Sequence, residues 1–162
     1  KPGDLRTRDA AATHLDSARR AASFVLEGMW DARSGRLWRR HRDGESAIDG
    51  FAEDYACMVF GLLELFETDA RAEWLEWASL LQARQDELFW DRDAGGWFAT
   101  SGLDASVRVR MKEDYDGAEP AARSIAVGNL LRQAHLGGVI EEAGDAERRV
   151  DHEAVDGAEG GL

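Results

Sequence analysis

The residues of this sequence best suited to chemistry are two acidic clusters, the second beginning 60 residues after the first. They are Glu53-Asp54-Tyr55 and Glu113-Asp114-Tyr115-Asp116. Pairs of carboxylates can act as general acid and base, so both clusters are candidate ligand contacts. The alternative is structural, because acidic side chains in a first helical turn offset the helix dipole and bind free N–H groups. Repetition favours the structural role, since a catalytic pair is usually unique.

Aromatic side chains near the clusters are further candidates for ligand contact. Trp38 and Trp97 can stack on a sugar ring, but an aromatic side chain more commonly covers the end of a helix bundle. Tyr55 and Tyr115 can donate a hydroxyl to a ligand. We expect instead that both tyrosine rings are buried between repeats and that their hydroxyls bond a neighbouring carboxylate or backbone group.

Lys112 directly precedes the second cluster. Its ammonium group can hold a substrate anion, or it can pair with Asp114 or Asp116, and we favour the ion pair. These observations name candidate ligand contacts, and they leave the catalytic residues unknown.

Motifs for other chemistries are missing from the sequence. Cys57 is the single cysteine and lies in an apolar run, so we expect a protonated thiol packed like a small hydrophobic side chain. The histidines lack metal-ligand spacing, and there is no phosphate-binding loop or nucleophile elbow. We therefore expect neither a metal nor a cofactor. The histidines are His14, His41, His135 and His152.

Composition limits the class of protein. The chain has 162 residues, 44% of them hydrophobic, which is enough for the core of one domain. Its formal net charge of −12 argues against nucleic acid or an anionic membrane as a partner. No stretch resembles a membrane span or a signal peptide, and one cysteine cannot form an internal disulfide. The expected location is the cytoplasm.

The acidic clusters belong to a longer repeat. The motifs Trp30-Asp31, Gly35 and Glu53-Asp54-Tyr55 recur as Trp90-Asp91, Gly95 and Glu113-Asp114-Tyr115. Such a period indicates a supersecondary unit of about 60 residues that buries its apolar face on the next unit. Asp31 and Asp91 each stand between a Trp and a Gly, so we interpret them as turn residues.

Apolar periodicity predicts four helices that position these motifs. They span about 9–30, 51–66, 72–89 and 122–134. The first and third carry an apolar stripe with charged residues opposite, as expected of outer helices. The second contains the unbroken apolar run 56–63 and the fourth has a wide apolar face, so both are expected to be inner helices.

Glycines and short apolar runs in the linkers 31–44 and 91–109 predict small β-hairpins between outer and inner helices. Such helical pairs build an α/α solenoid or a closed α/α toroid, and two pairs cannot close a ring. The sequence therefore predicts an all-α protein holding about two hairpins of an (α/α)6 toroid. The expected parts are a lead-in over 1–8, a partial barrel over 9–136 with repeats at 9–68 and 70–136, and a short helix with an acidic tail over 137–162.

Several stretches carry a family resemblance. They are Phe51-Ala-Glu-Asp-Tyr-Ala, Gly61-Leu-Leu-Glu-Leu-Phe-Glu, Trp74-Leu-Glu-Trp-Ala, Glu87-Leu-Phe-Trp-Asp, Gly95-Gly-Trp-Phe-Ala-Thr and Lys112-Glu-Asp-Tyr-Asp-Gly-Ala. In this order they resemble the C-terminal region of the thioredoxin-domain-containing proteins related to spermatogenesis-associated protein 20, also called the domain of unknown function 255 family. The likeness is nearly collinear over 10–136.

In that family a thioredoxin-like domain precedes a six-hairpin α/α barrel similar to those of glycosidases and N-acylglucosamine 2-epimerases. The resemblance implies a fragment or shortened relative with about two of the six hairpins and a link to carbohydrate metabolism. One turn departs from the family. After the second cluster the family usually reads Pro-Ser-Gly-Asn-Ser, whereas this chain reads Glu119-Pro120-Ala121-Ala122-Arg123-Ser124. That change puts an inherited ligand contact at this turn in doubt.

Two functions follow from these expectations. In the first, the chain is a barrel segment that contacts a carbohydrate-like small molecule at the acidic ends of its inner helices and is not catalytic alone. In the second, it is a non-catalytic interaction or scaffold module that completes a barrel with other segments or associates with itself. An incomplete ring and the altered turn favour the second function, and the sugar rests on fold analogy alone.

Overall fold

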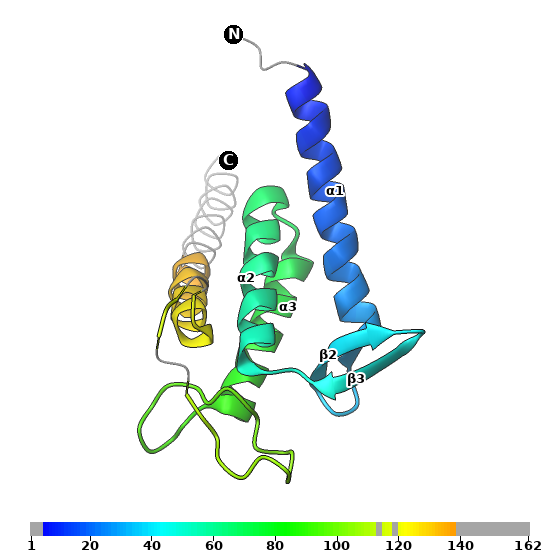
Figure 1. The fold of residues 1–162 in the computed structure, drawn as a ribbon. Coiled ribbons are helices and arrows are strands. Elements are labelled where there is room, and N and C mark those ends of the chain that lie inside the picture. Colours follow the sequence, from blue (N-terminus) through cyan, green and yellow to red (C-terminus); the bar gives the residue numbers. More distant parts are fainter. Residues whose placement is uncertain (1–4, 113–114, 118–119, 139–162) are drawn as a thin grey trace, which may run out of the picture. The chain divides into compact units, whose positions relative to one another are not determined.

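A computed structural model describes residues 5–112, 115–117 and 120–138 (Figure 1). The chain divides into two compact units, Lys1–Asn129 and Leu130–Leu162. Most of the described residues are helical, and a small sheet accompanies them. The short helix and tail expected over 139–162 lie outside the described residues.

The first helix, α1 (Leu5–Gly28), is mostly exposed along its described side chains. Only Ala22 and Leu26 are buried among its residues from 10 onward, and most of the others are exposed. It begins at Leu5 rather than near residue 9, so the helix includes four more residues than the sequence pattern predicted.

A three-stranded antiparallel sheet follows, in the order β1 (Trp30–Asp31), β2 (Arg36–Arg42), β3 (Glu45–Asp49). The two residues between β2 and β3 are Asp43 and Gly44, with φ values of 54° and 82°. Two positive φ values at the centre of a two-residue loop are what a tight hairpin requires. The predicted hairpin in the first linker is confirmed, and it extends to Asp49.

The helices α2 (Ala52–Asp69) and α3 (Ala72–Phe89) form the main helical pair, and they lie side by side in Figure 1. Ala70 separates them in the left-handed conformation, with φ 55°, and its N–H donates to the carbonyl of Phe66. This left-handed residue ends α2 and turns the chain back. The bounds of α3 match the sequence prediction, and α2 runs three residues past the predicted end at Phe66.

The core of the first unit surrounds α2. Seven of its residues are buried: Ala52, Tyr55, Ala56, Val59, Leu62, Leu63 and Leu65. They meet the buried residues Trp74, Ala78, Leu81 and Phe89 of α3, and burial of this apolar surface stabilises the pair. Two fully buried amides also hold α2. Gln85 donates to the carbonyl of Ala52 and Asn129 donates to the carbonyl of Ala56, both at 2.9 Å.

The sequence repeat has a counterpart in geometry. The N–H of Gly35 donates to the carbonyl of Asp31 and the N–H of Gly95 donates to that of Asp91, at 2.8 and 3.0 Å. Both glycines have positive φ, 63° and 71°. Each aspartate also accepts a bond from the N–H two residues later. The interpretation of Asp31 and Asp91 as turn residues is confirmed.

The predicted hairpin in the second linker is wrong for the described residues. Trp90 and Trp97 form one isolated bridge, at the position where Trp30 and Leu37 pair in the first repeat. Beyond it, the N–H of Ala99 donates to the carbonyl of Met111, and the chain between them forms a loop. In the first linker a two-residue turn lets the second strand pair directly with the first. The longer loop of the second linker has no such turn.

One face of α2 departs from expectation. An apolar run with no polar face was expected to need neighbours on all sides, with Cys57 packed inside. Instead Cys57, Gly61 and Glu64 are exposed, and the side chain of Phe60 is 47% exposed. These four residues are spaced so that they lie on one side of the helix and form one stripe, here called the α2 stripe.

Among the described residues, no helix is both long and apolar enough to cross a membrane.

Candidate functional site

The first acidic cluster makes its contacts at the start of α2, the helix to which it belongs. The Asp54 carboxylate accepts a hydrogen bond of 2.8 Å from the N–H of Phe51, the residue just before α2. Arg39 on β2 lies 3.5 Å from Asp54 and 3.9 Å from Glu53, and its guanidinium covers the Phe51 ring at 4.5 Å. These contacts cap the helix and balance its acidic first turn. Glu53 keeps 41% of its side chain exposed.

The two tyrosines of the repeat have different surroundings. Tyr55 is 1% exposed, packs edge-on against Phe89 and accepts a hydrogen bond of 2.8 Å from the N–H of Leu37. Burial raises the pKa of its hydroxyl, so the group is neutral. Tyr115 is 85% exposed, and the prediction that it is buried is wrong. Of the two, only Tyr115 presents its ring to solvent.

The second cluster does not open a helix. Residues 115–117 are not helical, and the next helix covers 122–138. Gly117 and Pro120 stand between the acidic cluster and this helix. A proline disfavours helical backbone at the residue before it. Asp116 nevertheless serves this helix, because its carboxylate accepts bonds from the N–H of Ala121 and the hydroxyl of Ser124. These bonds lower the pKa of Asp116. Asp114 and Glu113 lie outside the described residues.

Lys112 pairs with a residue that was not expected. Its ammonium lies 2.6 Å from the Asp91 carboxylate and donates to the carbonyl of Gly95, also at 2.6 Å. It also lies 5.1 Å from the Phe98 ring. The bond from Lys112, with backbone bonds in the turn, lowers the pKa of Asp91. The lysine therefore fastens the end of the second loop to the Trp-Asp turn, rather than pairing with Asp116.

The two candidate tryptophans differ in how far they are buried. Trp97 is 5% exposed, meets Trp90 edge-on and donates its indole N–H to Asp86 at 2.7 Å. Trp38 is half-buried on β2, opposite Asp49. The expectation that Trp97 covers the end of the helices is confirmed, because it closes the core where α3 ends.

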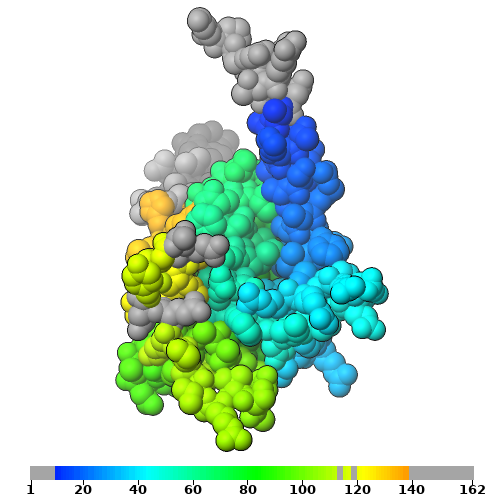
Figure 2. Space-filling view, viewed as in Figure 1, coloured from blue at the N-terminus to red at the C-terminus, as the bar shows by residue number. Residues whose placement is uncertain are grey.

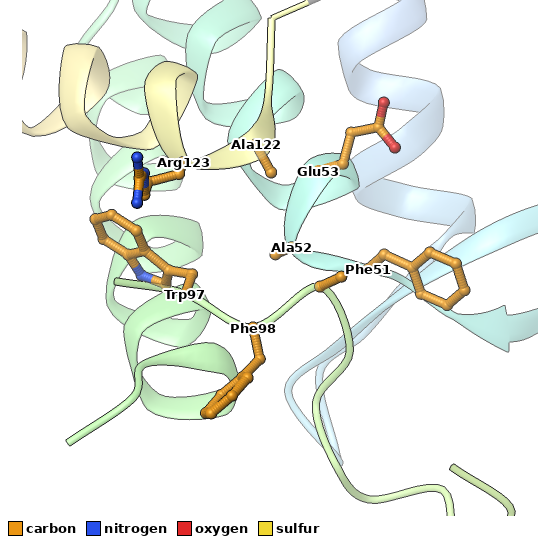
Figure 3. A pocket seen from close by; sticks show the side chains of 8 residues that line it. Phe51, Ala52, Glu53, Trp97, Phe98, Ala122 and Arg123 are labelled. Carbon is orange, nitrogen blue, oxygen red and sulfur yellow. The ribbon is translucent and has the colours of Figure 1, made fainter. Parts of the chain in front are cut away.

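A hollow lies where α2 and the helix 122–138 begin (Figure 3). It is lined by Phe51, Ala52, Glu53, Trp97, Phe98, Ala99, Ala122 and Arg123. In Figure 3 the Phe51 ring and the Glu53 carboxylate point away from its centre, while Arg123 lies beside Trp97. About 20 Å³ of space is room for one water molecule. Among the described residues, this hollow is therefore too small for a sugar-sized ligand.

A larger cleft lies between the β3–α2 connection and the loop after Trp97. It measures about 410 Å³ and is lined by Ile48, Asp49, Gly50, Phe51, Thr100, Ser101, Gly102, Asp104 and Val107. Figure 2 shows these two segments, the cyan hairpin and the yellow-green loop, next to each other on one face. The volume falls in the range of small-molecule sites.

Sequence reasoning did not single out any residue that lines this cleft as a site candidate. Asp49 and Asp104 stand alone in the sequence, and Phe51 and Thr100 occur only at the ends of two stretches that carry the family resemblance. A polar loop rich in Gly, Ser and Asp was the only available signal. Within the described part of the chain, no group of three or more His, Cys, Asp or Glu side chains has the geometry to hold a metal ion.

Comparison with known proteins gives relatives over most of the chain. Spermatogenesis-associated protein 20 of Homo sapiens is 43% identical over 127 residues, which is 73% of this chain and 16% of that protein. The Mus musculus protein of the same name is 45% identical over 120 residues, 68% of this chain and 15% of the relative. The chain is homologous to a segment of spermatogenesis-associated protein 20. An uncharacterized Caenorhabditis elegans protein is 39% identical over 127 residues.

The homology confirms the relationship that the sequence motifs indicated. The chain spans about 16% of the length of the human spermatogenesis-associated protein 20, so it corresponds to one part of a much longer polypeptide. No family model matches the chain. No solved structure matches it either.

Proposed function

We propose that this chain is a segment of an α/α barrel in a spermatogenesis-associated protein 20 homologue, and that it serves to complete that barrel with neighbouring helical segments. The observation that carries the proposal is the α2 stripe. Phe60 is 47% exposed on the helix that otherwise forms the centre of the core. Exposed apolar side chains that cluster on one face can mark a contact with a partner or a further segment.

The two proposed inner helices support this function by a shared burial pattern. Counting 70 residues forward from α2, the buried Ala52, Ala56 and Val59 correspond to Ala122, Ala126 and Asn129, which are also buried. The exposed Cys57 corresponds to Val127, which is 46% exposed. Both helices thus have buried and exposed residues at corresponding positions. Such a shared pattern is expected of corresponding helices in the repeats of an α/α barrel.

The relatives supply the missing length. The matched segment is 16% of human spermatogenesis-associated protein 20, which leaves ample chain for further hairpins. Contact of a sugar-like ligand with the acidic clusters remains a second proposal. Glu53 supports it, because its side chain is 41% exposed at the start of α2. Asp54 supports it less, because its carboxylate is engaged by Phe51 and Arg39.

The experiment is a chimera in which this chain replaces the matched segment of the human protein. Maleimide labelling of Cys57, followed by mass spectrometry of its peptide, should be fast in the isolated chain and at least tenfold slower in the chimera. Equal labelling rates in the two proteins would contradict the proposal.

Self-association gives a second readout. The isolated chain should associate as its concentration rises in sedimentation velocity, because the α2 stripe exposes the ring of Phe60. Phe60→Arg should reduce this association. Leu80→Arg is the matched control, since Leu80 is also 47% exposed but lies on α3, outside the stripe. Equal effects of the two substitutions would show that the stripe has no special role.

A further inference from the structure

The Trp-Asp turns of the two repeats have the same backbone bonds. The first turn is defined here as residues 29–38 and the second turn as residues 89–98. In the first turn the N–H of Trp38 donates to the carbonyl of Met29 at 2.8 Å, and in the second the N–H of Phe98 donates to that of Phe89 at 2.9 Å. Residues 60 positions apart are therefore equivalent, and the surroundings of the two turns can be compared contact by contact.

Helix α3 covers the first turn with two side chains. The ring of Trp77 meets the ring of Trp30 edge-on, with 5.9 Å between the centroids. Seven residues further along α3, Arg84 donates to the carbonyls of Gly35 and Ser34, at 2.6 and 3.0 Å. Residues seven apart lie on the same side of a helix, so a single side of α3 makes both contacts. Beneath this helix Trp30 and Ser34 are both half-buried.

The second turn has no such helix over it within the described residues. Trp90, the equivalent of Trp30, is 42% exposed. Its ring packs edge-on against Trp97, with 4.9 Å between the centroids, and this contact leaves much of the ring open. Trp90 is thus an exposed aromatic side chain at a position where the first repeat places a ring under a helix.

The carbonyls of the second turn repeat this difference. Lys112 donates to the carbonyl of Gly95 and takes over one of the two bonds that Arg84 makes in the first turn. Ala94, the equivalent of Ser34, is exposed, and no side chain of the described residues donates to its carbonyl. One aromatic contact and one hydrogen bond of the first turn therefore have no counterpart in the second.

A helix that supplies these two contacts has to come from outside this sequence. None of the residues beyond the described ranges is Phe, Trp or Tyr, so none of them can take the place of Trp77. The α3 helix of a second copy is not available either, because its Trp77 and Arg84 already contact the first turn of that copy. Human spermatogenesis-associated protein 20 has ample further chain, since the matched segment is 16% of its length.

We propose that the second turn is the docking site for a helix from another part of a longer homologue, and that this helix presents an aromatic side chain to Trp90 and an arginine, seven residues later, to the Ala94 carbonyl. Edge-on contact between aromatic rings is favourable, and a guanidinium has several donors for carbonyl oxygens. The exposed Asp93 also favours a positive charge at this place. The proposal rests on the barrel role proposed above, but its residues are not those of the α2 stripe.

The first measurement is oxidation by hydroxyl radicals, read by mass spectrometry of tryptic peptides. Trypsin places Trp30 in the peptide 21–33 and Trp90 in the peptide 85–92, each with no other tryptophan. In the isolated chain Trp90 should be oxidised faster than Trp30. Equal rates would mean that the chain already covers Trp90 and would overturn the proposal. A Trp90 rate that falls as the chain concentration rises would also overturn it, because a second copy would then be the occupant.

The second measurement uses the chimera in which this chain replaces the matched segment of the human protein. Trp90 should lose its excess rate there and react as slowly as Trp30. Trp30 is the internal control, because α3 covers it in both proteins. A faster rate at Trp90 than at Trp30 in the chimera would overturn the proposal.

Labelling of Cys57 in the same samples distinguishes this proposal from the barrel role. If Cys57 is protected in the chimera while Trp90 stays accessible, only the docking helix is overturned. If neither residue is protected, both proposals are overturned. Protection of Trp90 with Cys57 still reactive would support the docking helix and contradict the role of the α2 stripe.

A photoreactive side chain identifies the occupant. Trp90→benzoylphenylalanine in the chimera should cross-link, on irradiation, to a human peptide that carries an aromatic residue with an arginine seven positions later. Trp30→benzoylphenylalanine is the matched control and should cross-link to α3, whose Trp77 lies against that position. Cross-links from position 90 that stay within residues 1–162, or that reach a segment without an aromatic residue, would overturn the proposal.

Discussion

The side-chain amide of Asn129 donates a hydrogen bond of 2.9 Å to the carbonyl oxygen of Ala56, 73 residues earlier in the chain. The bond joins the helix 122–138 to α2. Gln85 makes the same kind of bond to Ala52, one helical turn away. Both amides are fully buried, so they fix how the second repeat sits on the first by specific bonds as well as by apolar packing.

Removing the Asn129 amide should destabilise the chain. Asn129→Ala loses the bond and leaves a small void, with an expected cost of about 1–3 kcal/mol in the free energy of unfolding measured in urea. Asn129→Asp should cost more, because a carboxylate would face the Ala56 carbonyl. Ser17→Ala is the control, since Ser17 is exposed and bonds only its own helix. A loss no larger than that of the control would contradict the role given to Asn129.

The two repeat tyrosines offer a matched pair. Tyr55→Phe should lower the free energy of unfolding by about 0.5–2 kcal/mol, because the N–H of Leu37 loses its partner in a buried site. Tyr115→Phe should leave it unchanged, since that ring is 85% exposed. Thermal unfolding followed by circular dichroism measures both. Similar losses in the two variants would mean that Tyr115 is buried in solution.

The first acidic cluster should separate into one cap and one weak ion pair. Asp54→Ala removes the bond to the Phe51 N–H and should cost about 0.5–2 kcal/mol of stability. Glu53→Ala removes only a long contact to Arg39 at the surface, so its cost should stay below about 1 kcal/mol. Urea unfolding of both variants checks the order. A larger effect at Glu53 than at Asp54 would reverse the interpretation.

Stability should fall in acid, and Asp91 should contribute to that fall. The bond from Lys112, helped by backbone bonds, puts the pKa of Asp91 below its unfolded value of about 3.9. The stabilising effect is therefore complete above that value and is lost as the pH drops through the lower folded pKa. Melting temperatures measured from neutral pH downward should show the decline below about pH 4.

Variants assign part of this acid response to the Asp91–Lys112 pair. Asp91→Asn and Lys112→Met should both lower the melting temperature at neutral pH and flatten its decline in acid. Asp43→Asn is the control, because the Asp43 side chain is 87% exposed in the hairpin turn. If Asp91→Asn leaves the acid decline as steep as Asp43→Asn does, the pair does not stabilise the fold.

Local features of this protein could be predicted from its sequence alone. The bounds of α3, the turns at Asp31 and Asp91 and the first hairpin each depend on residues close together in the chain. Helical periodicity and the chemistry of Asp and Gly in turns act over a few positions, so the sequence displays them directly. The 60-residue repeat and the relationship to spermatogenesis-associated protein 20 could also be recognised at this level.

Only the tertiary structure decided what each repeated side chain does. Tyr55 and Tyr115 occupy the same place in the repeat, yet one is buried against Phe89 and the other is exposed. Lys112 bonds Asp91, 21 residues earlier in the chain, and Cys57 is exposed on an apolar run. Burial and pairing depend on which segments arrive from elsewhere in the chain. The cleft near Thr100 exists for the same reason, because its two walls are some 50 residues apart in sequence and meet only when the chain folds.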